Sequence, residues 1–412
     1  MHWLTAAFLT AIAAETLMRW WLASRQIAFV QSHRNQVPAL FSGQIGPAEQ
    51  SKAADYTVAR VQIGRWAILS EALIKLVFTL GGGLAIIDGA FRATGFPEPW
   101  RGTLLALGVF CLLQLLGQPF AIWRTFGLEA RFGFNRTSPR LYLLDLGKRQ
   151  LLGLALFGPV LLIILLLMER AGPHWWIWAA VLCSAASVAI TWASPRFIAP
   201  LFNRFSPVTD AALNTRLQRL LERCGFAARG VFIMDGSRRS AHGNAYFTGI
   251  GRNKVVVLYD TLLTRIDGEE MEAVLAHELG HFRLRHVEQR LWLSVIGTFA
   301  GFAIVNWAMR QSDLFNALGV PVPSAAMALL LFALTAPVFT FLATPLRTWW
   351  WRRQEWAADE YSTQHADPRK LASALVKLYR DNASTVTPDR IYSRFYDSHP
   401  TAIERIERLI SR

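Results

Sequence analysis

Long apolar runs, separated by polar and charged segments, dominate the hydrophobic pattern of this chain. A helix needs about 20 predominantly apolar residues to cross the hydrocarbon core of a bilayer. Runs of this kind cover residues 3–23, 62–88, 102–123, 150–168, 174–193, 290–310 and 324–346. The pattern therefore predicts a mainly α-helical, polytopic membrane protein with seven transmembrane helices.

Two polar stretches, residues 194–289 and 347–412, lie outside these runs. In the first stretch, apolar residues recur at helical spacing over residues 213–223, which predicts an amphipathic helix. Short β-type segments follow, bounded by turn residues. The predicted strands cover residues 231–235, 244–250 and 254–259, with a turn at 251–253. We expect them to form a small β-hairpin or sheet.

Composition and charge agree with a membrane protein. The 412 residues are 53% hydrophobic and only 17% charged, with a formal net charge of +14. Basic residues concentrate in the loops at 24–60 and 124–149, and the positive-inside rule places such loops in the cytoplasm. This orientation puts the N-terminus outside, and the C-terminus and the polar stretches inside. It also accounts for the positive charge, so we expect no nucleic-acid partner. The compact, Arg-rich sequence is typical of a bacterial protein, which predicts the inner membrane as its location.

An H-E-x-x-H motif lies in the first polar stretch. Asp267 is a suitable N-cap and Glu270 falls at the capping-box position, so a helix is predicted here. Positions i and i+4 share one helix face, so His277 and His281 can bind one zinc ion. Glu278 lies beside them, where its carboxylate can take a proton from the attacking water. With nine histidines in the chain, a chance match to this motif is rare.

A catalytic zinc usually has three protein ligands and one open position. Glu355 and Asp359, four residues apart, share one face of a helix in the second polar stretch. We expect Glu355 to bind the zinc and Asp359 to stand behind it, orienting a ligand histidine.

Other interpretations of the same residues remain open. The acidic pair could instead be a solvated helix face that pairs with Arg352 and Arg353. His286 and Glu288 are weaker candidates for the third ligand, because they follow His281 too closely to fold back over the same metal.

The spacing of these motifs divides the chain into four parts. Residues 1–193 form a five-span N-terminal membrane region, and residues 194–289 form the first block of a zinc metalloprotease domain. Residues 290–346 form two further transmembrane helices, and residues 347–412 form the second block. The spans between the blocks tie the zinc site to the membrane.

Two further features are candidates for substrate contacts. His399 precedes a predicted helix at 401–406 and, near zinc, could stabilise the oxyanion that forms when water attacks a peptide carbonyl. Alternatively, it is a structural residue at a helix start. The edge of the predicted strands could hold an extended peptide by backbone hydrogen bonds. Alternatively, these strands form a plain structural hairpin.

Ionisable residues also occur inside the predicted spans. Glu15 lies in the first span, and Glu71 and Lys75 lie in the second at i, i+4 spacing. Such groups are costly at membrane depth unless they are paired or face water. They predict either a self-satisfied Glu71–Lys75 pair or a water-filled cavity between the helices. The three cysteines show no spacing typical of a disulfide framework or a second metal site.

Taken together, the motifs resemble those of the type I CAAX prenyl endopeptidases, which are integral-membrane zinc metalloproteases. The segments that carry the resemblance are residues 200–205, 240–247, 277–281, 355–359 and 398–400, with Glu404 and Arg405. One departure is Trp356, where that family often has phenylalanine. The resemblance covers most of residues 195–410 by motif, whereas the first 190 residues agree mainly in span count.

This resemblance implies seven helices around a large water-filled chamber, with a gluzincin-like zinc site at its cytoplasmic side. It implies that Glu355 is the third zinc ligand, that Asn244 and His399 contact the substrate or the oxyanion, and that Arg405 supports the site.

We therefore expect a membrane-embedded zinc endopeptidase with one Zn²⁺ per chain. Its partners would be membrane lipids and a peptide or protein substrate, prenylated near its C-terminus or otherwise membrane-associated. Two alternatives stay open. One is a heat-shock-type quality-control protease, which usually has fewer spans. The other is a transporter or scaffold with a vestigial zinc site, against which the intact Glu278 argues, because a structural zinc needs no general base.

Overall fold

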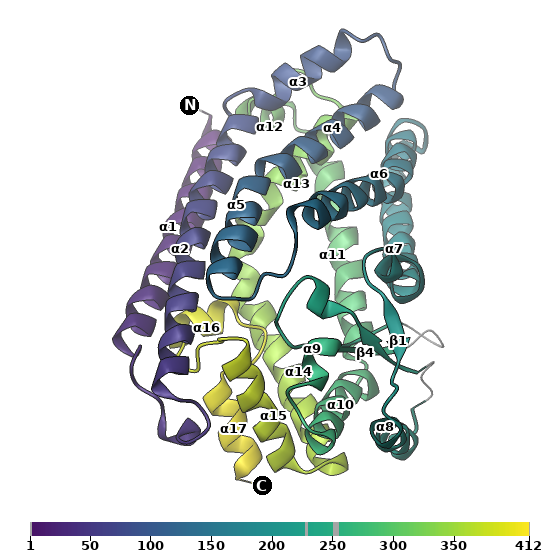
Figure 1. Ribbon diagram of the computed structural model, residues 1–412. Helices are drawn as coiled ribbons and strands as arrows, with labels where there is room; N and C mark the ends of the chain where they lie inside the picture. The colour runs from purple at the N-terminus through teal and green to yellow at the C-terminus, as the bar shows by residue number, and fades with distance from the viewer. Residues whose placement is uncertain (1, 227–229, 250–254, 412) are drawn as a thin grey trace.

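Long helices make up most of the molecule, and a small sheet lies among the helices at one end (Figure 1). The computed structural model describes residues 2–226, 230–249 and 255–411. The helices of the long bundle are α1 (Trp3–Ser32), α2 (Pro47–Phe78), α3 (Gly83–Arg92), α4 (Trp100–Leu116), α5 (Gln118–Ile122), α6 (Pro139–Arg170), α7 (Trp175–Ala193), α11 (His286–Ala308), α12 (Ser312–Ala317) and α13 (Ala325–Thr340). The helices at the sheet end are α8 (Ala211–Arg223), α9 (Asp260–Leu263), α10 (Gly268–Arg283), α14 (Thr344–His365), α15 (Pro368–Asp381), α16 (Arg390–Tyr396) and α17 (Ala402–Ile410).

All seven predicted spans fall on helices. The predicted number of membrane-crossing helices, seven, is approximate. In the described residues, five helical segments are long and apolar enough to cross a membrane. The pair α2–α3, bent by 50°, makes a sixth if it is counted as one span. Helix α1 is not among them, because Glu15 and Arg19 lie within its apolar run and lower its hydropathy. The chain is therefore a multi-pass membrane protein with α1 packed along α2.

Of the two alternatives for the ionisable residues, the self-satisfied Glu71–Lys75 pair is wrong. Lys75 Nζ lies 2.8 Å from Glu15 Oε2 on α1, and Arg19 Nη1 bridges Glu15 at 3.2 Å and Glu71 at 2.7 Å. The partners come from the neighbouring helix because packing α1 on α2 places the buried Glu15 between the two cations. These groups are thus paired across the α1–α2 interface, which lowers the cost of placing them at membrane depth.

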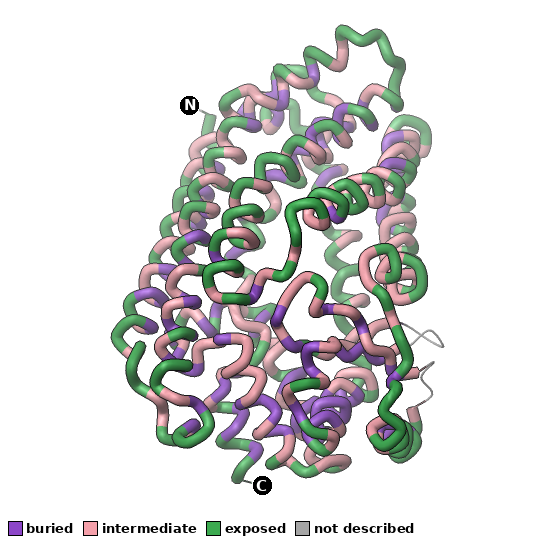
Figure 2. Tube along the Cα trace, viewed as in Figure 1, coloured by how far each residue is buried: buried purple, intermediate pink, exposed green. Residues whose placement is uncertain are grey.

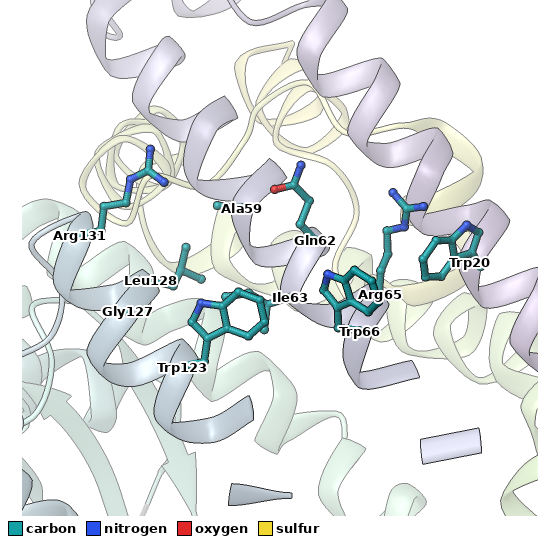
Figure 3. Close-up of a pocket in the computed structure, with 10 residues that line it drawn as sticks. All are labelled: Trp20, Ala59, Gln62, Ile63, Arg65, Trp66, Trp123, Gly127, Leu128 and Arg131. Atoms are coloured by element: carbon teal, nitrogen blue, oxygen red, sulfur yellow. The ribbon is translucent and has the colours of Figure 1, made fainter. Parts of the chain in front are cut away.

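Three adjoining cavities lie among the helices. A cavity of about 670 Å³ is lined by Arg65, Arg131 and three tryptophans (Figure 3). It shares Ile63 and Leu128 with a second cavity of about 680 Å³. The second cavity shares Arg60 with a third, of about 490 Å³. The three cavities therefore neighbour one another along the helices.

In the described residues the sheet has four strands in the order β1-β2-β4-β3. The strands are β1 (Phe205–Pro207), β2 (Val231–Met234), β3 (Ala245–Thr248) and β4 (Val255–Tyr259). Three of them were predicted, and the predicted turn at 251–253 lies outside the described residues. β1 was missed because three residues ending in proline carry little strand signal. β2 pairs parallel with β4, and β3 pairs antiparallel with β4 at the edge. β3 is therefore an edge strand, as the peptide-binding hypothesis requires.

One hydrophobic core joins the sheet to the helices around it. Its fully buried members include Leu217 of α8, Leu258 of β4, Leu275 of α10, Leu371 of α15 and Ile406 of α17. Figure 2 shows buried residues gathered at this end, whereas exposed residues cover much of the long helices. Exposed apolar side chains on those helices, such as Leu73 and Leu151, suit contact with lipid.

Candidate metal and active site

The start of α10 is fixed by the predicted capping box. Asp267 Oδ1 accepts hydrogen bonds of 2.9 Å from the backbone N–H groups of Glu269 and Glu270, and Glu270 Oε2 accepts one from the Asp267 N–H. This arrangement satisfies otherwise unpaired donors of the first turn. It sets the helix register that places His277 and His281 one turn apart.

A carboxylate from α14 meets the two histidines. Glu355 Oε2 lies 3.5 Å from His277 Nε2, and Glu355 Oε1 lies 3.3 Å from His281 Nε2. The potential ligand atoms of these three residues lie within 4.8 Å of one another, and they form the one such group among the described residues. The structure thus brings together the three residues that were predicted as metal ligands.

The donor set suits a metal ion. Both histidines direct Nε2 at the same carboxylate, and two imidazoles plus one glutamate match the protein ligands of a catalytic zinc. Glu355 Oε2 is buried and has only two long contacts among the described residues, with His277 Nε2 at 3.5 Å and His399 Nε2 at 3.4 Å. Because an unsatisfied buried carboxylate oxygen is costly, this atom fits a bound cation.

The other side of His277 is held by two buried residues. His277 Nδ1 lies 2.9 Å from Asp359 Oδ1, and the Arg405 guanidinium donates to both oxygens of Asp359, at 2.6 and 3.0 Å. Burial opposes the charged form of His277, but its hydrogen bonds to Asp359 and Glu355 raise its pKa to about 9. Burial also opposes the charge on Arg405, but the Asp359 carboxylate raises the pKa of that guanidinium. Asp359 and Arg405 therefore lie where a ligand histidine needs an orienting partner.

His281 has a different partner, His286, which the sequence offered only as a weaker candidate for the third metal ligand. Arg285 adopts a left-handed backbone conformation (φ 56°) between α10 and α11. This tight junction turns the chain so that His286 Nδ1 lies 2.9 Å from His281 Nδ1. His286 is thus a neighbour of a ligand candidate and is not part of the metal-ligand group.

Glu278 lies on α10 beside the two histidines and is half-buried. It is not part of the metal-ligand group. Burial raises the pKa of its carboxyl group, partly opposed by the neighbouring His277. A carboxylate with a raised pKa is a better proton acceptor, which suits a general base.

His399 lies at the rim of the same group. Its Nε2 is 3.4 Å from Glu355 Oε2, and its side chain is 57% exposed. It lines the cavity of about 490 Å³ together with Arg405. Desolvation lowers the pKa of His399, which favours the neutral ring.

Asn244 is exposed and directly precedes the edge strand β3. Its carbonyl oxygen accepts a hydrogen bond from the Tyr259 N–H, so its backbone continues the ladder with β4. The preceding Gly243 is held by Asn382, whose side chain accepts from the Gly243 N–H and donates to its carbonyl. Asn382 carried no sequence signal, because it lies 139 residues away in the chain.

Helices α10 and α14 approach closely at Gly280. A Cβ atom there would lie 3.1 Å from the Cα and the carbonyl oxygen of Ala358 and from Cβ of Tyr361. Two of these atoms are backbone atoms of α14, the helix that carries Glu355, and the third is bonded directly to its backbone. They therefore cannot yield unless α14 moves. The absence of a side chain at this position therefore sets the distance between the histidines and the glutamate.

Gly280→Ala is expected to destabilise the protein by about 1–3 kcal/mol through overpacking. Because a misplacement of about 1 Å can cost about a hundredfold in rate, the kcat/KM of a reaction that depends on this ligand group should fall steeply as well. Gly297→Ala in α11 is the matched control, since no heavy atom lies within 4 Å of its added Cβ. Thermal unfolding and steady-state kinetics would check both. Equal behaviour of the two variants would contradict the close-packing argument.

Comparison with known proteins agrees with this geometry. Residues 26–204 match the family model described as CAAX prenyl protease N-terminal, five membrane helices, and residues 207–412 match peptidase family M48. CAAX prenyl protease 1 of Saccharomyces cerevisiae is 31% identical, with 91% of this chain and 88% of the relative covered. The CAAX prenyl protease 1 homolog of Arabidopsis thaliana is 32% identical, with 73% and 72% covered. The crystal structure of S. mikatae Ste24p superposes with a TM-score of 0.90, at 26% identity and 99% coverage of both chains.

The fold, the ligand group and these similarities define a multi-pass membrane metalloendopeptidase. The chain belongs to peptidase family M48, among the members that also carry the CAAX prenyl protease N-terminal membrane helices.

Proposed function

We propose that this protein is a zinc-dependent endopeptidase that hydrolyses peptide bonds near the C-terminus of prenylated, CAAX-type membrane polypeptides. The observation that carries the proposal is the grouping of His277, His281 and Glu355 across two helices. The names of the relatives, which are CAAX prenyl proteases, support the choice of substrate.

In this proposal His277, His281 and Glu355 hold one Zn²⁺ per chain. When bound, Zn²⁺ would polarise the scissile carbonyl and lower the pKa of water in the site. Asp359 holds His277 by its Nδ1, and Arg405 holds Asp359. This chain of buried contacts fixes the ring with Nε2 directed at the ligand group.

Glu278 performs the proton transfers. Its carboxylate takes a proton from the attacking water and later gives it to the leaving amine. His399, whose lowered pKa favours the neutral ring, donates an N–H to the oxyanion as the carbonyl becomes tetrahedral. Both residues border the ligand group from different elements, Glu278 from α10 and His399 from the loop before α17.

The edge strand β3 and Asn244 bind the substrate. An extended peptide can add to the free edge of β3 by backbone hydrogen bonds, and Asn244 lies at the start of that edge. The contacts of Asn382 with Gly243 keep this start rigid.

The catalytic unit in this proposal consists of residues 194–289 and 347–412. The shared core, with Leu217 and Leu275 from the first block and Leu371 and Ile406 from the second, supports this division. Basic loops at 24–60 and 124–149 support a cytoplasmic location of the site, and the compact, Arg-rich sequence supports a bacterial inner membrane.

The test is cleavage of a farnesylated CAAX peptide by the purified full-length protein. We expect release of the last three residues, abolished by a chelator and restored by Zn²⁺. Loss of activity with the chelator but no recovery with Zn²⁺ would assign another metal. If the folded, metal-loaded protein leaves this peptide intact but degrades unprenylated membrane proteins, the substrate assignment is wrong and a quality-control protease is the better description.

A further inference from the structure

Arginines line the cavity of about 680 Å³ between α2, α4, α5 and α6. Arg60, Arg124 and Arg149 contribute to its wall, and its lining contains no aspartate or glutamate. The other polar lining residues are three glutamines, a threonine and Tyr142. A cavity with three guanidinium groups and no acid has a positive potential that attracts an anion.

Two acidic groups outside the lining, Glu129 and Asp145, act on Arg124 and Arg149, but their closer partners are other side chains. Arg124 Nε lies 3.8 Å from Glu129 Oε1, near the limit for an ion pair. The Arg60 guanidinium lies over the Tyr56 ring at 5.6 Å, and neither Arg60 nor Arg149 forms an ion pair within 4 Å in the described part of the chain. The cavity thus holds donors and charge that an anionic ligand would satisfy.

Arg60 connects this cavity to the catalytic site. It lines both the arginine cavity and the cavity that contains His399 and Arg405. The latter also contains Asp397, an acidic group that Arg60 influences electrostatically without a close ion pair. Arg60 therefore lies in the same cavity as His399, which contacts Glu355 of the metal-ligand group.

We infer that Arg60, with Arg124 and Arg149, binds the C-terminal carboxylate of the substrate. This inference rests on the proposed function, in which the released fragment is a tripeptide that ends in a free carboxylate. Three extended residues span about 10 Å, so a carboxylate bound at Arg60 would fix which peptide bond meets Glu278. The arginine cavity therefore determines which peptide bond, counted from the C-terminus of the substrate, is cleaved.

The experiment compares two farnesylated peptides that differ only at the C-terminus, one a free acid and the other a carboxamide. Because charge-assisted hydrogen bonds are roughly twice as strong as neutral ones, we expect kcat/KM to be about tenfold lower for the amide, mainly through KM. Arg60→Gln should lower kcat/KM for the acid and bring the acid-to-amide ratio of kcat/KM close to one. Arg60→Lys keeps the positive charge and should retain part of the preference for the acid.

Arg140→Gln is the matched control, because Arg140 is an exposed arginine on the same helix as Arg149 and does not line the cavity. The Arg140→Gln variant should keep the acid-to-amide ratio of the wild-type protein. Arg149→Gln is a second cavity variant, in case Arg60→Gln fails to fold, and it should reduce the ratio as well.

The outcomes separate this inference from the proposed function. Absence of cleavage of either peptide by the wild-type protein would reject the proposed function. Equal cleavage of acid and amide, or a ratio that persists in both cavity variants, would overturn the carboxylate site alone. The protein is also assayed in vesicles that differ in anionic lipid content. If Arg60→Gln cleaves the acid and the amide equally poorly, and a change in anionic lipid reverses this loss, the cavity binds a lipid phosphate and the carboxylate site is overturned as well.

Discussion

Glu278→Gln is expected to lower kcat by about 10²- to 10⁴-fold and to leave the metal content unchanged. The range is the usual contribution of a positioned general acid–base group. Glutamine keeps the size of the side chain but cannot accept the proton of the attacking water. The metal stays because Glu278 does not belong to the ligand group of His277, His281 and Glu355. Steady-state kinetics with the farnesylated peptide and metal analysis on the same sample would measure both.

Glu269→Gln is the matched control on the same helix. Glu269 lies in the first turn of α10, is half-exposed and pairs with Lys370 at the surface. Surface ion pairs contribute little, so this variant should keep nearly full kcat. Full turnover in the Glu278 variant would refute its role as the general base. Loss of metal in that variant would instead give Glu278 a part in binding.

The local parts of the site could be predicted from the sequence. The capping box at Asp267 and Glu270, the i, i+4 spacing of His277 and His281, and the acidic pair on α14 depend on the geometry of single helices. Helix geometry is encoded by neighbouring residues, so spacing alone indicates which side chains share a face. The sequence could propose that Glu355 meets the histidines, but the meeting itself depends on the packing of α10 against α14.

Contacts between distant elements could not be predicted from spacing. Lys75 pairs with Glu15, 60 residues away, because α1 and α2 pack side by side. Asn382 holds Gly243 across 139 residues, and no periodicity links them. Likewise, the sequence predicted strands but not their order, since the parallel pairing of β2 with β4 is decided by the chain between them. For Arg405, only the resemblance to a known family indicated a role, because its partner Asp359 is 46 residues away.

Glu355→Gln is expected to abolish stable metal binding and, with it, cleavage of the peptide. Loss of an outer partner of a metal ligand typically costs 10–100-fold in affinity, so loss of a ligand charge should cost at least the upper part of that range. The variant keeps the side-chain volume between α10 and α14, so the helices should still pack. Metal content after dialysis, measured against wild type, gives the primary result, and kcat/KM gives the consequence.

Glu288→Gln separates this effect from the general loss of a carboxylate near the site. Glu288 lies in the first turn of α11, and one of its oxygens is buried without a hydrogen-bond partner in the described residues, as in Glu355. It is absent from the ligand group, however, so its variant should retain the metal. If Glu355→Gln retains the metal and Glu288→Gln loses it, the third ligand is reassigned to α11. The reverse result would tie the metal to the α10–α14 contact, whose closeness depends on Gly280.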